Sequence, residues 1–97
     1  MSYSLVVKEE ALLDIVEITA WYEKKRKKLG AEFVAELDTV LKQLKKSPFQ
    51  YQVQKKEIRQ ASLHKFPYLV IYEIEEKIIV VYSVLHTSRN PKLKYKK

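Results

Sequence analysis

Two long apolar runs near the C-terminal end of the chain constrain its fold more than any other feature. They cover residues 68–74 (YLVIYEI) and 78–85 (IIVVYSVL), and residues 75–77 (EEK) form a short polar turn between them. Tyrosine, valine and isoleucine dominate both runs, which is the composition of a pleated and packed surface. We therefore predict an antiparallel β-hairpin at the centre of the only sheet, and we expect this sheet to position the functional residues.

The two runs differ in how many of their faces are apolar. The second run is apolar on both faces, whereas Glu73 interrupts the first. A strand that is apolar on both faces is typical of the interior of a sheet. The second run is therefore predicted to be an interior strand, and the first is predicted to have one partly open face.

Upstream of the hairpin, the pattern predicts one strand and then a helix. Residues 2–7 (SYSLVV) form the first predicted strand. The helix is predicted from the charged turn at residues 8–10 to about Lys28, because apolar residues recur at helical spacing between them. Its apolar face is expected to contain Leu12, Ile15, Val16, Thr19 and Tyr22, widened by Ala11 and Ile18.

A second helix follows the only glycine of the chain. Gly30 is expected to end the first helix in a left-handed conformation. From Phe33 to Leu44, apolar residues recur at positions i, i+4, i+7, i+8 and i+11, which predicts an amphipathic helix. The Ser47-Pro48 pair is expected to end it. Because the connection is short, the two helices are predicted to form an antiparallel hairpin.

The remaining segments complete the predicted topology. Residues 49–56 (FQYQVQKK) alternate apolar and polar side chains, and they are compatible with either a strand or an extended loop. Strands are predicted at residues 57–63, 67–75 and 77–86. The predicted order is β-α-α-β-β-β, an α+β fold in which a helical hairpin packs on one face of a small, mostly antiparallel sheet. Residues 1–97 suit a single domain.

The composition excludes several kinds of site. Without cysteine, the chain has no disulfide and no thiolate ligand or nucleophile. One glycine cannot build a phosphate-binding loop, and two histidines are too few for a typical histidine metal site. No apolar run approaches the roughly 18–20 residues of a membrane span, and the start lacks the features of a secretory signal. We therefore expect a cytoplasmic protein without metal, cofactor or membrane contact.

The chain is strongly basic, with 19 Lys and Arg against 12 Asp and Glu and a net charge of +7. Such a surface favours polyanions or an acidic protein partner. Two stretches stand out, residues 24–28 (KKRKK) and the tail from Thr87 onwards. The first is compatible with either a solvated surface or a binding site, and for the tail a functional role is favoured.

Basic and aromatic side chains are the remaining candidates for function. Beside a sheet, such residues could bind RNA through phosphate contacts and base stacking. Cleavage of RNA without a metal would require cations to stabilise the pentavalent phosphate and a group to transfer protons. Arg89 and Tyr95 could serve in these roles. Tyr68, Tyr72 and Tyr82 are expected to pack in or beside the core.

The C-terminal half of the chain resembles the RelE/ParE superfamily of type II toxin–antitoxin toxins. The matching features there are Ile58-Arg59, Phe66-Pro67-Tyr68, Tyr72, His86, Arg89 and Pro91. Upstream, the matching residues in the same order are Ala11, Asp14, Ile15, Trp21-Tyr22, Leu29-Gly30, Phe33, Leu37 and Pro48. The resemblance covers nearly the whole chain, and it implies the same β-α-α-β-β-β fold.

The resemblance also implies a growth-inhibiting toxin that a small cognate antitoxin, encoded beside it, neutralises in a toxin–antitoxin hetero-oligomer. One branch resembles RelE, a ribosome-dependent mRNA endonuclease, and the other resembles ParE, which inhibits DNA gyrase. In the nuclease branch the catalytic residues would be Arg59, Arg89 and Tyr95. The residues expected to bind the target or substrate are Lys55, Lys56, Lys65, His86, Lys92 and Lys94.

One position separates the two branches. RelE-type nucleases place an arginine directly after the tyrosine that starts the third strand, and this chain has Leu69 after Tyr68. A missing phosphate-stabilising cation commonly lowers the rate by two or more orders of magnitude. The Phe-Pro-Tyr and His-x-x-Arg-x-Pro features are also more typical of ParE-like members. We therefore expect a ParE-like, plasmid-stabilisation toxin that binds gyrase, with an mRNA endonuclease as the alternative.

Overall fold

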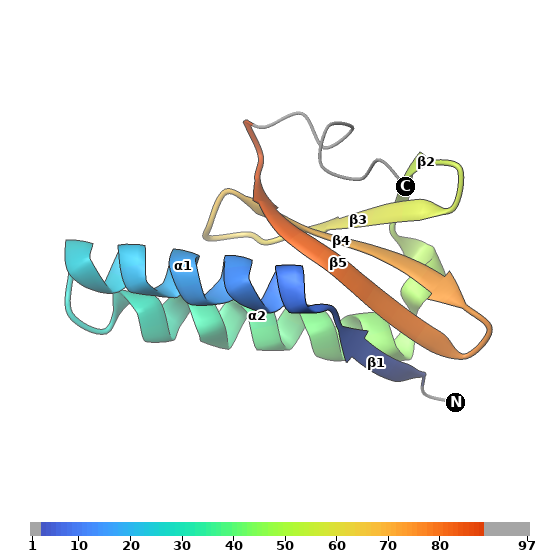
Figure 1. The fold of residues 1–97 in the computed structure, drawn as a ribbon, viewed down its shortest axis with the longest axis horizontal. Helices are drawn as coiled ribbons and strands as arrows, with labels where there is room; N and C mark the ends of the chain where they lie inside the picture. The colour runs from blue at the N-terminus through green and yellow to red at the C-terminus, as the bar shows by residue number, and fades with distance from the viewer. Residues whose placement is uncertain (1–2, 89–97) are drawn as a thin grey trace.

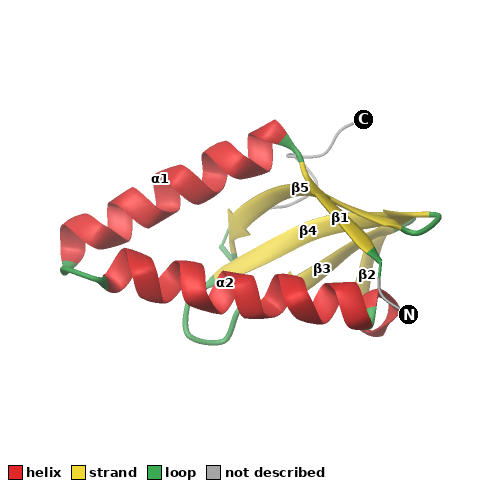
Figure 2. Cartoon of the chain, turned by 90° about the horizontal axis from the view of Figure 1, so that it is seen from below, coloured by secondary structure: helices red, strands yellow, loops and turns green. Residues whose placement is uncertain are grey.

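A helical hairpin covers one face of a five-stranded sheet (Figures 1 and 2). The computed structural model describes residues 3–88. Its elements in chain order are β1 (Ser4–Val7), α1 (Glu9–Lys25), α2 (Leu29–Lys46), the 3-10 helix η1 (Pro48–Gln50), β2 (Gln52–Lys55), β3 (Ile58–Ser62), β4 (Tyr68–Glu75) and β5 (Ile78–His86). The predicted α+β fold is confirmed, with one strand more than the predicted order contains.

The predicted hairpin lies at the centre of the sheet. The strand order is β1-β5-β4-β3-β2, with β1 parallel to β5 and every other pair antiparallel. β5 therefore has a neighbour on both sides, as its two apolar faces predicted. The N-terminal strand β1 completes the sheet beside β5, far along the chain from its own position (Figure 1).

The extra strand comes from the segment that was compatible with either a strand or a loop. It contains both η1 and the short edge strand β2. Two side chains from the sheet hold it in place. The guanidinium of Arg59 donates hydrogen bonds to the backbone oxygens of Phe49 (3.3 Å) and Tyr51 (2.8 Å). The buried hydroxyl of Tyr72 donates to the backbone oxygen of Pro48 at 2.7 Å.

The turn between the helices differs from the prediction. α1 ends at Lys25 and not near Lys28, and Gly30 lies inside the first turn of α2 with no positive φ. Lys28 takes the left-handed conformation, with φ 73°. The carboxylate of Glu23 stabilises this turn by accepting hydrogen bonds from the backbone N–H groups of Lys28 (2.8 Å) and Gly30 (3.0 Å).

The two helices contribute unequally to the core. α2 buries the predicted stripe, including Phe33, Leu37 and Leu44. α1 buries only Ala11 and Ile18 completely. Leu12 and Val16 were expected on its core face, but they are 50% and 64% exposed. The prediction for these two residues is therefore wrong. The side of α1 that packs on the sheet is narrower than the apolar side that the sequence of this helix contains.

α1 is also attached to the sheet by a polar contact. The β4–β5 register shifts so that Ile71 lies opposite Ser83 and Tyr72 opposite Val81, which leaves Tyr82 as the extra residue of a bulge. Two residues after Tyr82, the backbone N–H of Val84 donates to Asp14 Oδ2 at 3.0 Å. Asp14 therefore attaches α1 to β5.

Candidate interaction surfaces

The far face of the sheet, meaning the face turned away from the helices, carries an apolar cluster. Leu69 lies opposite Leu85, and Ile71 pairs with both Ser83 and Gln60. Ile58, Leu69, Ile71 and Leu85 form one buried cluster, and Tyr82 packs against it. Leu69, the residue that departs from the nuclease pattern, is thus part of this cluster.

A buried carboxylate borders the far-face cluster. Glu73 is only 8% exposed, and its Oε1 accepts a hydrogen bond from the Tyr82 hydroxyl at 2.9 Å. The first apolar run was expected to be partly open at Glu73, and this expectation is wrong. In the described part of the chain, the only arginine or lysine on strands β3 to β5 is Arg59. On the far face, the described residues of these strands therefore contribute buried apolar groups and an acid, and no Lys or Arg.

Arg59 lies on the other side of the sheet. It is opposite Tyr72, whose side chain packs in the core beneath the helices. Its guanidinium donates to two backbone oxygens and lies 5.1 Å from the centre of the Phe49 ring. Burial raises the pKa of Tyr72, while the nearby Arg59 charge acts in the opposite direction. Arg59 thus has a structural role between η1, β2 and the sheet.

The other predicted binding residues do not converge on one point. Lys55 and Lys56 are exposed at the β2–β3 turn, whereas Lys65 is exposed in the β3–β4 loop, beyond the opposite end of β3. His86 ends β5, where its ring lies 5.2 Å from Tyr68 and its Nδ1 accepts from the backbone N–H of Ser88 at 3.1 Å. The remaining predicted residues, Arg89, Lys92, Lys94 and Tyr95, lie outside the described residues.

The predicted packing of the three strand tyrosines is confirmed. Tyr72 is fully buried, and Tyr68 and Tyr82 are partly buried against the two apolar clusters. Tyr68 packs edge-on against the rings of Tyr22 and Phe33, at centroid distances of 6.2 and 5.7 Å. Burial, followed by the neighbouring Tyr68, raises the pKa of Tyr22. These tyrosines are parts of the packed structure, and the raised pKa values keep the hydroxyls of Tyr22 and Tyr72 protonated at neutral pH.

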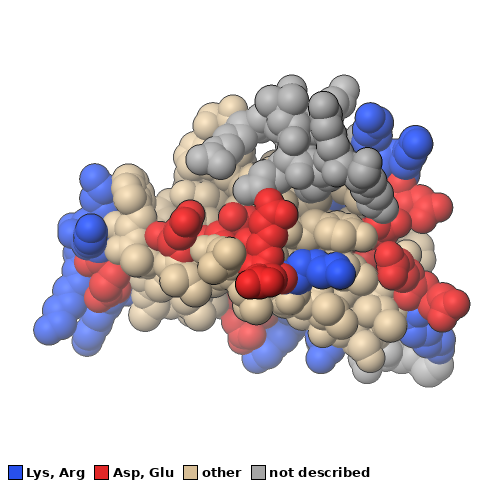
Figure 3. Space-filling model, in the orientation of Figure 1, with Lys and Arg blue, Asp and Glu red and all other residues tan. Residues whose placement is uncertain are grey.

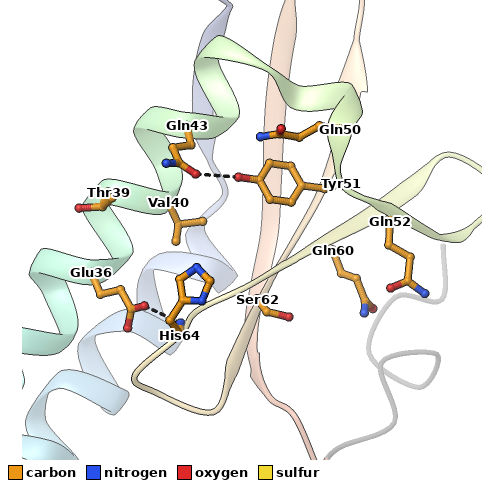
Figure 4. Close-up of a pocket in the computed structure, with 10 residues that line it drawn as sticks. All are labelled: Glu36, Thr39, Val40, Gln43, Gln50, Tyr51, Gln52, Gln60, Ser62 and His64. Atoms are coloured by element: carbon orange, nitrogen blue, oxygen red, sulfur yellow. Dashed lines mark hydrogen bonds between the residues drawn. The ribbon is translucent and has the colours of Figure 1, made fainter.

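A polar groove lies between α2 and β3 (Figure 4). It has a volume of about 350 Å³, and the residues that line it are Glu36, Thr39, Val40, Gln43, Gln50, Tyr51, Gln52, Gln60, Ser62 and His64. The Tyr51 hydroxyl donates to Gln43 Oε1 at 3.0 Å. Glu36 accepts from the backbone N–H groups of His64 and Lys65, so its carboxylate fastens the β3–β4 loop to α2. The groove offers amide groups for hydrogen bonding, together with the His64 side chain and the Glu36 carboxylate.

The exposed side of α1 forms a second candidate surface. Leu12, Leu13 and Val16 are all at least half exposed, and they define what we call the α1 apolar face. Exposed apolar groups that gather on one side of a helix make that side a candidate protein-binding surface. The sequence already indicated this second apolar side. In residues 11–18, apolar side chains cover a wider part of the helix circumference than a single core-facing stripe needs.

The described part of the chain shows neither a metal site nor a membrane span. Residues 3–88 contain no group of three or more His, Cys, Asp or Glu side chains that could hold a metal ion. Over the same range, neither helix combines the length and the hydrophobicity needed to cross a bilayer.

Three solved structures with a similar fold come from toxin–antitoxin systems. A chain of the chromosomal ParDE toxin–antitoxin system from P. aeruginosa is similar with a TM-score of 0.79 at 16% identity, over 90% of this chain and 98% of that one. The intact E. coli RelBE complex gives 0.67 at 24% identity, over 91% and 100%. The RelBE2 complex from Mycobacterium tuberculosis gives 0.59 at 15%, over 89% and 99%. The fold is therefore that of the RelE/ParE toxins.

The sequence assigns the chain within this class. The profile of the family described as "ParE toxin of type II toxin-antitoxin system, parDE" matches residues 5–91. The chain belongs to this family, and it is a type II toxin of the RelE/ParE superfamily. No curated protein sequence matches it.

Proposed function

We propose that this toxin inhibits growth by binding DNA gyrase, and not by cutting RNA. The far face of the sheet is the observation that carries the proposal. Metal-free cleavage of RNA requires cations beside the reacting phosphate. On the described strands, that face instead carries the buried Leu69 cluster and the Glu73 carboxylate.

The proposed inhibition depends on contacts between proteins, and the α1 apolar face suits such contacts. Its three exposed side chains are available to a partner, whereas the core stripe of α2 is already covered. The P. aeruginosa and E. coli relatives are toxin–antitoxin complexes. We propose that a cognate antitoxin binds this chain as well, in a cytoplasmic hetero-oligomer, and that the pair stabilises a plasmid.

The alternative is a ribosome-dependent mRNA endonuclease. It is supported by the sequence match of Arg89 and Tyr95 to the basic residue and the late tyrosine of the nuclease branch. In that case Arg59 would contribute through the positive charge it places beside β2, and Lys55 and Lys56 would bind the RNA backbone at the same end of β3.

The two functions are separated by two assays on the purified full-length chain. The first measures supercoiling of a relaxed plasmid by gyrase, and the second maps mRNA ends in a translation reaction. We expect supercoiling to be inhibited and the mRNA to stay intact, and added antitoxin should restore supercoiling. Cleavage of the mRNA that Arg89→Ala abolishes, with gyrase unaffected, would overturn the proposal.

A further inference from the structure

Five consecutive basic residues occupy the end of the helical hairpin, away from the sheet. Residues 24–28, which we call the hairpin tip, include the last turn of α1 and the connection to α2. All five are exposed. Figure 3 shows Lys and Arg side chains projecting at this end of the molecule, with some acidic side chains beside them and further Lys and Arg side chains at the opposite end.

Most of the charge on the hairpin tip is not neutralised by neighbouring acids. Within residues 3–88, Arg26 is the only member of the tip with an ion pair, to Glu32 at 3.4 Å. Lys25 Nζ lies 4.6 Å from the centre of the exposed Trp21 ring. The nearby carboxylate of Glu23 is occupied by two backbone N–H groups. Lys24, Lys27 and Lys28 are therefore free to contact an anion.

The backbone at Lys28 is left-handed. Its φ of 73° is a conformation that glycine or asparagine adopts with less strain, and Lys56 and Glu76 in the strand turns share it. The chain has a lysine here and no glycine, which places one more exposed cation in the turn.

We propose that the hairpin tip binds the phosphate backbone of duplex nucleic acid. The exposed cations of the tip suit a polyanion of high charge density, and duplex DNA carries one negative charge per roughly 1.7 Å of its axis. Such contacts are independent of base sequence. An anionic membrane is a different class of partner, and the vesicle experiment below tests it. The inference does not depend on gyrase being the target.

Two matched double variants test the location of the site. Lys24→Gln/Lys25→Gln removes both lysines from the last turn of α1, and Lys45→Gln/Lys46→Gln removes the equivalent pair from the last turn of α2. Both variants lose two charges at a helix C-terminus. Binding is measured by fluorescence anisotropy with the full-length chain and a DNA duplex of about 20 base pairs, at salt concentrations from about 50 to 200 mM.

The hairpin-tip variant should bind the duplex about tenfold more weakly at low salt. In a plot of the logarithm of the binding constant against the logarithm of the salt concentration, its slope should be shallower by about 2, since each phosphate contact contributes about 0.9. The α2 variant should change the slope by less than about 0.5. Equal losses in both variants would show attraction by net charge alone and would overturn the proposal. Unchanged binding in the tip variant would do the same.

Lys28→Gly separates binding from folding. Because glycine relieves the left-handed strain, its urea denaturation midpoint should equal or exceed that of the wild type, while its affinity for the duplex falls severalfold. Unchanged affinity in this variant would contradict the proposal. The same titrations with an RNA duplex of equal length show whether the hairpin tip binds the phosphates of DNA or of RNA more tightly. Tip-dependent binding to phosphatidylserine vesicles, without binding to either duplex, would overturn the inference.

Discussion

Gly30 lies in the first turn of α2, where its Cα approaches the backbone of α1. A Cβ atom at this position would lie 2.7 Å from the backbone oxygen of Thr19 and 3.0 Å from Glu23 Oε1. Contacts below 3.0 Å with backbone atoms require the helices to move apart. The close approach of the two helices therefore explains why this position has a glycine. The backbone conformation does not explain it, because the φ of Gly30 is not positive.

Gly30→Ala should lower the free energy of unfolding by about 1–3 kcal/mol, the usual range for overpacking. Helix propensity alone predicts the opposite sign, a gain of roughly 1 kcal/mol. Urea denaturation of the purified protein distinguishes the two. A variant that is more stable than the wild type would show that the helix contact is loose enough to accept a methyl group.

Tyr72 combines complete burial with a hydrogen bond to Pro48. Burial raises the pKa of its hydroxyl, so the folded protein keeps the proton that the unfolded chain releases near pH 10. The stabilisation is complete below about pH 10 and decreases as the pH rises towards the folded-state value.

We expect the free energy of unfolding to decrease more steeply above about pH 10 in the wild type than in Tyr72→Phe. Near neutral pH the variant should be less stable by about 1 kcal/mol, because one hydrogen bond is lost. Urea midpoints measured across this pH range provide the comparison. Tyr22, whose pKa is also raised, contributes equally to both proteins. If the plots of urea midpoint against pH are parallel for the two proteins, ionisation of Tyr72 does not destabilise the folded state.

At the scale of the elements, α1 has two apolar sides with different roles. One side packs Ala11 and Ile18 on the sheet, and Asp14 fixes its orientation through the backbone of β5. The opposite side carries the α1 apolar face. A helix that is apolar around most of its circumference is stable in water only if the exposed side is small or is covered by a partner.

Val16→Glu should weaken binding of the antitoxin at least tenfold, because it places a charge in the centre of the α1 apolar face. Val34→Glu on α2 is the matched control, since Val34 is also an exposed helical valine. Both changes should alter stability by no more than about 0.5 kcal/mol, as is usual at exposed positions. Binding is measured by titration calorimetry. A greater loss of affinity for Val34→Glu would place the partner on α2.

At the scale of the whole molecule, an aromatic cluster joins the two layers. Phe33 of α2 lies 5.8 Å from the Tyr22 ring of α1 and 5.5 Å from the Phe66 ring, which precedes β4. Its side chain is fully buried. Because one residue contacts both helices and the sheet, its loss affects the hairpin and the sheet together.

Phe33→Ala should destabilise the protein by about 3–5 kcal/mol, the usual cost of removing a buried ring. This approaches the total stability of a small domain, so a large unfolded fraction is expected. Val34→Ala, next to it and exposed, should change the unfolding midpoint little. Circular dichroism during thermal unfolding measures both. A cooperative transition of Phe33→Ala at the wild-type temperature would show that the aromatic cluster is not what holds the layers together.

The candidate surfaces were predictable to different degrees. The local pattern located the β4–β5 hairpin, the interior position of β5 and the stripe of α2, because each depends on spacing within one segment. The sequence also showed that Leu69 stands where the nuclease branch has an arginine, and the structure adds that Leu69 lies in the far-face cluster. The burial of Glu73 was not visible in the sequence, because it depends on a hydrogen bond from Tyr82 and on the bulge that positions that residue.

The sequence by itself determined the class of fold, the central hairpin and the family. These follow from periodicity and from an ordered set of residues, both of which are local properties of the chain. Only the tertiary structure decided that residues 52–55 form an edge strand, that Lys28 and not Gly30 is left-handed, and that Leu12 and Val16 face outwards. The three cases have one physical reason. When a segment can adopt two conformations, or has two apolar sides, the neighbour it packs against decides which conformation it adopts or which side is buried, and that neighbour is distant in the sequence.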